Sequence, residues 1–244
     1  MRDIRGRFPV LSRTVRDGRP LVYLDSGATS HKPESVLDAE RDFYTRMNSA
    51  PHRGAHALSE EATEAYEGAR ERIARFIGAG TDEIVFTKSA TESLNLVAHA
   101  LSGGPHPQAP GSEDIVLRPG DEVLVTELEH HANLVPWQEL CARTGATLRW
   151  LDLDAEGRID LGTLDVITER TRVLALTHAS NVTGAITPLV DILPAARAVG
   201  ARGRAHRPAS SRIAWMRATS SSMKAVKSSP VSSASTQAFV SSTC

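Results

Sequence analysis

The sequence predicts an α/β fold, a doubly wound and mainly parallel sheet with helices on both of its faces. From about residue 83 to residue 201, short apolar runs alternate with segments in which apolar residues recur at helical spacing. Two of the runs, Val123-Leu124-Val125 and Val173-Leu174-Ala175-Leu176, are apolar at consecutive positions. Such runs are typical of parallel strands that helices cover on both sides.

The expected elements follow one another in regular alternation. Residues 26–30 form a small-residue loop, and Ser59 is a candidate N-cap for a first helix. Apolar residues recur in this helix from Ala62 to Phe76, until Gly78 ends the pattern. Strands are then expected at residues 83–87, 122–126, 147–153 and 172–177, and helices at 91–101, 134–143, 161–169 and 189–199.

Composition divides the chain into residues 1–201, a partial domain, and residues 202–244, a Ser- and Arg-rich tail. The tail contains no Asp or Glu and seven Lys or Arg. Residues 1–201 therefore hold 21 of the 28 basic residues and all 29 acidic ones. Where the alternation requires another buried strand, the tail begins with arginines and Pro208, which a central strand disfavours. We therefore expect a truncated sheet followed by a disordered or out-of-frame tail.

The bulk composition excludes several classes of protein. Two cysteines, Cys141 and Cys244, provide no disulfide framework and fit a reducing, cytoplasmic compartment. Cys141 falls on the buried side of a predicted helix, which indicates an inert core thiol. No apolar run reaches the ~18 residues of a membrane span, and no signal core follows Met1. The basic tail lacks interleaved aromatics and a helical face, so no nucleic-acid partner is expected.

Three loops after strands carry the candidate binding residues, because open α/β sheets bind ligands at the carboxyl ends of their strands. After the first strand, Ala90 and Thr91 open a helix whose free N–H groups could bind a phosphate, unless Thr91 is an ordinary N-cap. After the second, His130 could stack on a flat heterocycle and Asn133 could cap the next helix, or the segment is merely a polar loop. After the fourth, Asn181 could donate to a phenolate or a carboxylate, or it simply forms a turn before a glycine.

The adjacent His130 and His131 also raise the possibility of zinc, as in a zinc-dependent hydrolase. Adjacent side chains project differently, however, and the i, i+4 histidine pair of a helical zinc motif is missing. No carboxylate or cysteine stands at ligand spacing either. No metal site is therefore expected.

Five runs together resemble a known family: Asp25-Ser26-Gly27-Ala28-Thr29, Pro51-His52-Arg53-Gly54-Ala55-His56, Lys88-Ser89-Ala90-Thr91-Glu92-Ser93, Glu129-His130-His131-Ala132-Asn133-Leu134-Val135-Pro136-Trp137 and Ser180-Asn181-Val182. This is the pyridoxal-phosphate-dependent cysteine desulfurase and selenocysteine lyase family, Suf type, of the class V aminotransferase group, and the resemblance covers about residues 8–201. It implies the large domain of a fold-type I pyridoxal-phosphate-dependent transferase and a homodimer with sites at the subunit boundary. It also implies conversion of L-cysteine or selenocysteine to alanine, with sulfur passed through a protein cysteine to a sulfur-acceptor protein for sulfur metabolism or iron–sulfur cluster assembly.

The resemblance implies roles for residues by their matching positions. The Ala90 backbone and Thr91 would hold the cofactor phosphate, His130 would stack on the pyridine ring, and Asn181 would meet the phenolic oxygen. Ala28, His52 and Arg53 would lie toward the substrate. Ala90 stands where many relatives have a hydroxyl residue, which leaves only the contribution of its backbone.

The residues after position 201 depart from the family pattern. The family continues with Asp-x-Ala-Gln, whose Asp pairs with the pyridine nitrogen, and with Ser-Gly-His-Lys, whose Lys forms the Schiff base. Neither string occurs in residues 202–244, where Lys224, Lys227 and Cys244 stand in other contexts. No catalytic residue is therefore assigned, and turnover by this chain alone is not expected. The alternative is a non-catalytic fragment or interaction protein that keeps a dimer-forming surface.

Overall fold

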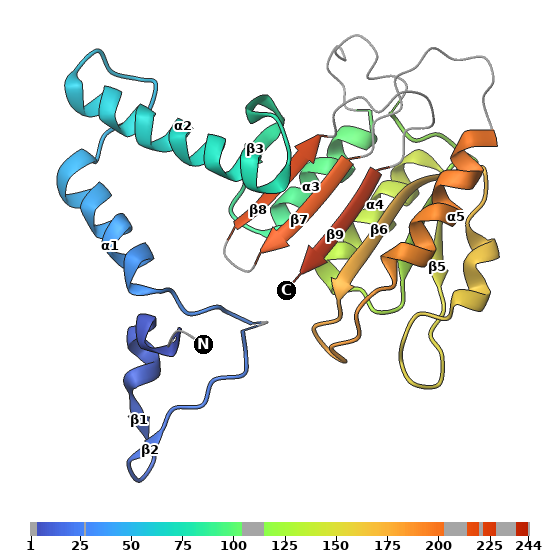
Figure 1. Ribbon diagram of the computed structural model, residues 1–244. Helices are drawn as coiled ribbons and strands as arrows, with labels where there is room; N and C mark the ends of the chain where they lie inside the picture. The colour runs from blue at the N-terminus through green and yellow to red at the C-terminus, as the bar shows by residue number, and fades with distance from the viewer. Residues whose placement is uncertain are drawn as a thin grey trace. The chain divides into compact units, whose positions relative to one another are not determined.

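The computed structural model describes residues 4–26, 28–103, 115–202, 214–219, 222–227 and 238–243, with side chains up to residue 199. The chain forms two compact units, Met1–Asp82 and Glu83–Cys244 (Figure 1). All four candidate cofactor-binding residues belong to the second unit, whereas Ala28, His52 and Arg53 belong to the first.

A long helix, α2 (Ala57–Ile77), dominates the first unit. It begins after His56, whose Nδ1 accepts a hydrogen bond from the Ser59 N–H at 3.3 Å, and it ends at Gly78 with a left-handed φ of 71°. The predicted cap, Ser59, is wrong: this residue lies inside the first turn, where its buried hydroxyl donates to the Ala50 carbonyl at 2.9 Å. Ser59 thus ties the preceding loop to the helix.

The other elements of the first unit are short. Neither α1 nor η3 is among the predicted elements. The N-cap of α1, Pro33, makes no side-chain hydrogen bond, and none of the α1 residues is buried. The elements are η1 (Arg5–Arg7), η2 (Pro9–Ser12), the antiparallel pair β1 (Thr14–Val15) and β2 (Arg19–Pro20), α1 (Glu34–Asp42) and the π-helix η3 (Phe43–Met47).

The second unit alternates strands and helices, as predicted. A 3-10 turn, η4 (Thr81–Glu83), leads into its first strand. The order is then β3 (Ile84–Phe86), α3 (Ala90–Leu101), β4 (Glu122–Thr126), η6 (His131–Asn133), α4 (Val135–Thr144), β5 (Thr147–Leu151), η7 (Leu161–Val166), β6 (Thr171–Ala179) and α5 (Leu189–Arg202), followed by β7 (Ala214–Thr219), β8 (Ser222–Lys227) and β9 (Ala238–Thr243).

These strands form one sheet in the order β3-β8-β7-β9-β6-β4-β5. Strand β4 pairs in parallel with β5, from Glu122↔Thr147 to Thr126↔Leu151, and in parallel with β6. Strand β8 is antiparallel to both β3 and β7, while β7, β9 and β6 run parallel. Every strand of this sheet except β8 therefore points in the same direction, and the expected parallel sheet is confirmed.

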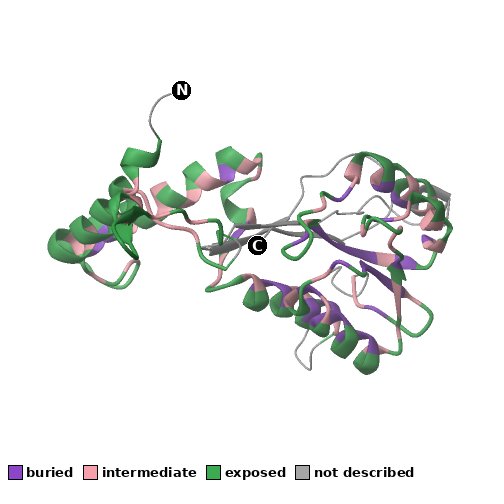
Figure 2. Ribbon diagram, turned by 90° about the horizontal axis from the view of Figure 1, so that it is seen from below, coloured by how far each residue is buried: buried purple, intermediate pink, exposed green. Residues whose placement is uncertain are grey.

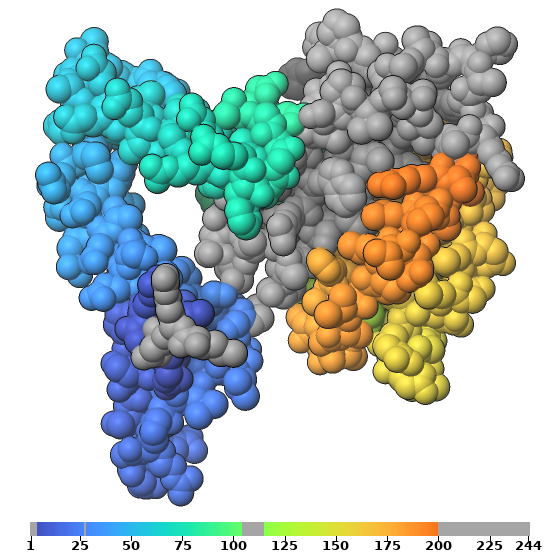
Figure 3. Space-filling view, viewed as in Figure 1, coloured from blue at the N-terminus to red at the C-terminus, as the bar shows by residue number. Residues whose placement is uncertain are grey.

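Helices cover both faces of the three strands β5, β4 and β6 (Figure 2). On one face, Val123 and Val125 of β4 pack with the buried residues of α3 and α4, among them Leu94 and Trp137. On the other face, Leu124 of β4 packs with residues from β5, β6, η7 and α5. Figure 3 shows the α5 segment (orange) beside the β5–η7 segment (yellow). Consecutive apolar residues of β4 therefore serve two separate cores, which explains the unbroken apolar run.

One predicted helix is wrong in type. Residues 161–169 were expected to be α-helical, but they contain the 3-10 helix η7, which ends at Val166 and leaves Ile167 extended. The Asp160 carboxylate accepts a hydrogen bond from the Gly162 N–H at 2.8 Å. The glycine in the first turn and the β-branched residues that follow it disfavour continuation as an α-helix.

The tail contains strands where none was expected. Strands β7, β8 and β9 all lie after residue 201, and β9 pairs with β6 from Val173↔Ala238 onward. The runs Ala214-Trp215-Met216 and Ala238-Phe239-Val240 are short and apolar, and such runs favour strands. A tail of separate origin that starts at residue 202 stays a prediction.

The two-sided core generates a stability prediction. Leu176 of β6 is fully buried in the cluster under α5, so Leu176→Ala should lower the free energy of unfolding by about 2–5 kcal/mol. Val190 at the start of α5 is 82% exposed, and Val190→Ala should change it by less than about 0.5 kcal/mol. Urea unfolding of both variants measures the difference, and equal effects would contradict the assignment of the core.

Candidate functional site

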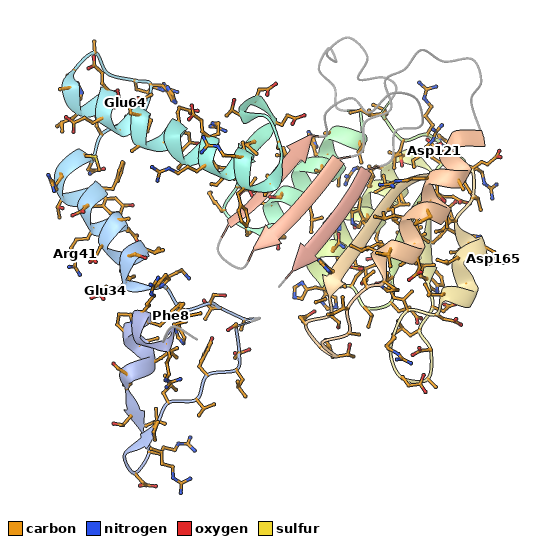
Figure 4. All side chains as sticks on the ribbon, viewed as in Figure 1. Phe8, Glu34, Arg41, Glu64, Asp121 and Asp165 are labelled. Carbon is orange, nitrogen blue, oxygen red and sulfur yellow. The ribbon has the colours of Figure 1, made fainter. Side chains whose placement is uncertain are left out.

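The loops that carry the candidate residues leave the same edge of the sheet. Strands β3, β4 and β6 point in one direction, and each is followed by one of these loops. Helix α3 packs against both α4 and η6, which joins the first two loops through a shared core. Asp121, labelled in Figure 4, lies at the opposite edge, where it pairs with Arg172 at 3.0 Å.

The first loop leaves two backbone donors open at the start of α3. The N-cap is Ser89, whose Oγ accepts a hydrogen bond from the Glu92 N–H at 3.2 Å, and Glu92 Oε2 accepts one from the Lys88 N–H at 2.5 Å. Thr91 is therefore not the N-cap, and it is exposed. Among the described residues, the N–H groups of Ala90 and Thr91 and the Thr91 hydroxyl have no hydrogen-bond partner. Such groups at a helix N-terminus suit an anion.

His130 is presented by the second loop, directly after β4. Its side chain is exposed, and its Nδ1 accepts a hydrogen bond from the Ala132 N–H at 3.1 Å, so His130 caps η6. A neutral ring held in this way carries its proton on Nε2. The ring of His131 stands 6.1 Å away between centroids and is tilted by 44°. The His130 ring is thus held by the backbone and faces outward.

The residues around His130 form a buried hydrogen-bond network. The Glu129 carboxylate accepts from Thr126 Oγ1 at 2.7 Å and from the Thr177 N–H of β6 at 2.8 Å. Asn133 Nδ2 donates to the other carboxylate oxygen at 2.6 Å, and Trp137 Nε1 donates to Asn133 Oδ1 at 3.0 Å. Asn133 was predicted to cap the next helix, which is wrong: it is fully buried and belongs to this network.

Burial shifts the titration of Glu129. It raises the pKa of the Glu129 carboxyl from 4.5 to about 7, although the hydrogen bonds from Thr177, Asn133 and Thr126 lower it. All three donors are uncharged. The sequence analysis assigned no role to Glu129, and the one local signal is the spacing of four residues that separates Glu129 from Asn133 and Asn133 from Trp137.

Asn181 stands at the tip of the third loop, directly after β6. Ser180 makes the turn: its Oγ accepts hydrogen bonds from the Val182 and Thr183 N–H groups, both at 3.2 Å. Gly184 closes the loop with a φ of 73°, a conformation that favours glycine. Asn181 is exposed, and its amide makes no hydrogen bond to another described residue. The turn therefore does not depend on the Asn181 side chain.

The three residues expected on the substrate side all belong to the first unit. His52 and Arg53 are neighbours in the loop before α2, where His52 adopts a φ of 60° and its Nε2 lies 3.1 Å from Glu67 Oε1. Arg53 is exposed and its side chain makes no hydrogen bond within the described residues. Ala28 lies apart from them in an exposed turn, where its N–H donates to the Asp25 carbonyl at 3.2 Å.

The expected core thiol is confirmed. Cys141 of α4 is 8% exposed and packs in the same cluster as Trp137 and Leu94. Burial raises the pKa of its thiol to about 11. The nucleophilic thiolate is therefore scarce at neutral pH. Cys244 lies outside the described residues.

The described part of the chain holds no group of three or more His, Cys, Asp or Glu side chains that could bind a metal ion. None of its helices combines the length and apolar character needed to cross a membrane.

The raised pKa of Glu129 predicts a pH dependence of stability. Between pH 4.5 and about 7 the folded chain keeps a proton that the unfolded chain releases. The stability contributed by this group is therefore fully present below pH 4.5 and is lost as the pH rises through about 7. The loss is at most about 3 kcal/mol.

Urea unfolding at about pH 5 and about pH 8 measures this contribution. Relative to the wild type, Glu129→Gln should gain roughly 1–3 kcal/mol of unfolding free energy between the lower and the higher pH. Glu139→Gln, which removes an exposed carboxyl of α4, is the control and should show no such gain. A wild-type–variant difference that is equal at the two pH values would contradict the raised pKa.

Known proteins resemble this chain over the part that contains all the candidate residues. Residues 22–203 match the family model of class V aminotransferases. A probable cysteine desulfurase 2 of Mycobacterium leprae (strain TN) is 54% identical over 198 residues, which cover 81% of this chain and 46% of the relative. A probable cysteine desulfurase of Streptomyces coelicolor is 50% identical over 200 residues, with the same coverage. The chain thus spans under half the length of these curated relatives.

Solved structures share the fold. The apo cysteine desulfurase of Thermococcus onnurineus NA1 has a TM-score of 0.68 at 35% identity, and the match covers 80% of this chain and 44% of that one. The cysteine desulfurase CsdA of Escherichia coli has a TM-score of 0.66 at 34% identity, covering 91% and 56%. A C-DES mutant with glycine covalently linked to its PLP cofactor has a TM-score of 0.60 at 22% identity, which indicates a common fold alone. This chain therefore belongs to the class V aminotransferase family, and the curated relatives that it resembles over this range are cysteine desulfurases.

Proposed function

We propose that this chain provides the phosphate-binding and ring-binding side of a pyridoxal phosphate site of the cysteine desulfurase type. The observation that carries the proposal is the open first turn of α3. Its N-cap is already satisfied by Ser89, so the N–H groups of Ala90 and Thr91 and the Thr91 hydroxyl remain available to a phosphate. Family membership supplies the identity of the ligand.

The first turn of α3 would bind the phosphate by hydrogen bonds and by the helix dipole. Two N–H groups and one hydroxyl at the start of a twelve-residue helix can donate to three phosphate oxygens. The Glu92 carboxylate is occupied by the Lys88 N–H at 2.5 Å and therefore points back along the chain. The backbone contribution of Ala90 does not need the hydroxyl that many relatives carry at this position.

His130 and Asn181 would bind the ring. The His130 imidazole is exposed, and its backbone-anchored Nδ1 holds it in one orientation, which suits stacking on a flat heterocycle. The Asn181 amide is free to donate to the phenolic oxygen of that heterocycle, because Ser180 makes the turn in its place. All these residues lie within the matched range 22–203.

Turnover requires more than this set of residues. Bound pyridoxal phosphate supplies an electron sink for the carbon skeleton of an amino acid. The family pattern adds an Asp that pairs with the ring nitrogen and a Lys that anchors the cofactor, and neither motif occurs in residues 202–244. The chain alone would then bind the cofactor reversibly and leave cysteine unconverted. The substrate-side roles of Ala28, His52 and Arg53, a homodimer and a sulfur-acceptor partner belong to the proposal for the complete site.

Equilibrium dialysis against pyridoxal phosphate tests the proposal on the full chain. Thr91→Ala removes a hydroxyl that would donate to a charged phosphate and should weaken binding by about tenfold. Ser102→Ala removes a hydroxyl from the other end of α3, where it donates to the His99 carbonyl at 2.7 Å, and should leave the affinity unchanged. Pyridoxal without its phosphate should bind far more weakly than the phosphate ester.

The same samples test the catalytic part of the proposal. Borohydride treatment should add no cofactor mass to the polypeptide, and alanine release from L-cysteine should stay at the rate of free cofactor. Equal binding of pyridoxal and its phosphate would overturn the binding site. Stoichiometric trapping by borohydride, or robust alanine release, would overturn the claim of reversible binding without turnover.

A further inference from the structure

We propose that Glu129 is the positioning residue of this site: its carboxylate fastens the His130 loop to β6 and thereby sets where the imidazole stands. Glu129 directly precedes His130, yet its carboxylate points inward and its partners come from β4, β6 and η6. The link to β6 spans 48 residues of sequence. The effect of this link on cofactor binding rests on the proposed function, whereas the attachment of the His130 loop to β6 by Glu129 does not.

The polarity of the network follows from a group that can only donate. The indole N–H of Trp137 has no acceptor capacity, so the Asn133 atom 3.0 Å away must be the amide oxygen. The Asn133 nitrogen then faces Glu129 at 2.6 Å and must donate to it. Trp137 is fully buried in the core beneath α4, so its N–H has no access to water and depends on the Asn133 oxygen.

The other carboxylate oxygen also faces donors. The Thr177 N–H is a backbone donor, and the Thr126 hydroxyl already accepts from the Leu128 N–H at 3.1 Å, which leaves its own proton for Glu129. Among the described residues, both oxygens of Glu129 thus meet only donors. Above its raised pKa of about 7, the ionised carboxylate satisfies this arrangement, whereas the amide of a glutamine would place its own N–H groups against those of Asn133 or, if flipped, against the Thr177 N–H.

The loop that holds His130 depends on these bonds at both of its ends. Thr126 is the last residue of β4 and Asn133 is the last residue of η6, so Glu129 connects the start of the loop to its end. The Asn133 N–H also donates to the His130 carbonyl at 2.7 Å. Asn133 is thus bonded to His130 through its backbone and to Glu129 through its side chain.

Exchange of the carboxylate and the amide between positions 129 and 133 tests the proposal. Glu129→Gln alone creates the donor–donor conflict with Asn133, whereas Glu129→Gln combined with Asn133→Asp reverses that bond and restores it: Gln donates, and Asp accepts from both Gln and Trp137. Glu127→Gln is the matched control, because Glu127 is an exposed neighbour whose carboxylate accepts from the Leu153 N–H at 3.2 Å. The readouts are the NMR signals of the His130 ring, amide exchange in residues 130–133, and the Kd for pyridoxal phosphate.

The expected pattern separates positioning from general stability. Glu129→Gln should shift the His130 ring signals, speed amide exchange of the loop and weaken pyridoxal phosphate binding by about tenfold or more. The double variant should return all three readouts to near the wild-type values, and Glu127→Gln should leave them unchanged. Thr126→Val deletes one of the three hydrogen bonds to Glu129, together with the bond from the Leu128 N–H. This variant should shift the His130 signals partially and is measurable even if Glu129→Gln does not fold.

Failure of this inference can be distinguished from failure of the proposed function. If wild-type chain binds no pyridoxal phosphate, the proposed function fails, while the His130 signals and loop exchange still decide the role of Glu129. Unchanged His130 signals in both Glu129→Gln and Thr126→Val would overturn the positioning role. A double variant that resembles Glu129→Gln in all readouts would overturn the deduced polarity of the network.

Discussion

Burial of the parallel strands β4 and β6 on both faces is the constraint on which the second unit depends. Val123 and Val125 of β4 serve one core and Leu124 the other, so a shift of one residue in β4 would disrupt both cores at once. The register between β4 and its neighbours is thereby determined, and so is the point at which each strand ends. The loops that follow β3, β4 and β6 consequently leave the sheet at one edge, the edge at which open α/β sheets bind their ligands.

Much of this arrangement could be predicted from local patterns. The bounds of β4 match the prediction, and α3, α4 and α5 differ from it by one to three residues, because apolar periodicity and two-sided burial leave a clear signature in sequence. The residues that form α1 and η7 have weaker signals: no α1 residue is buried, and a glycine stands in the first turn of η7. The short apolar runs that form β7 and β9 are hard to recognise in the sequence because they stand among the serines and arginines of the tail.

Only some residues of the candidate site could be predicted from the sequence. Small residues before a helix and an exposed imidazole after a strand are visible in the sequence, so Ala90, Thr91, His130 and Asn181 could be named from it. The roles of Ser89 and Ser180 depend on which side chain turns back onto the backbone, and the sequence offers several hydroxyls at each place. The role of Glu129 depends on Thr177, which lies on another strand, and no local pattern indicates such a pairing.

In the proposed function, helix α3, the His130 loop and the Asn181 turn make up one preformed site for the cofactor. NMR titration of the full chain with pyridoxal phosphate tests this claim most directly. We predict that the amides of Ala90 and Thr91, the ring of His130 and the side-chain amide of Asn181 shift together with one Kd. Shifts confined to other residues, or different Kd values for these four, would contradict a single preformed site.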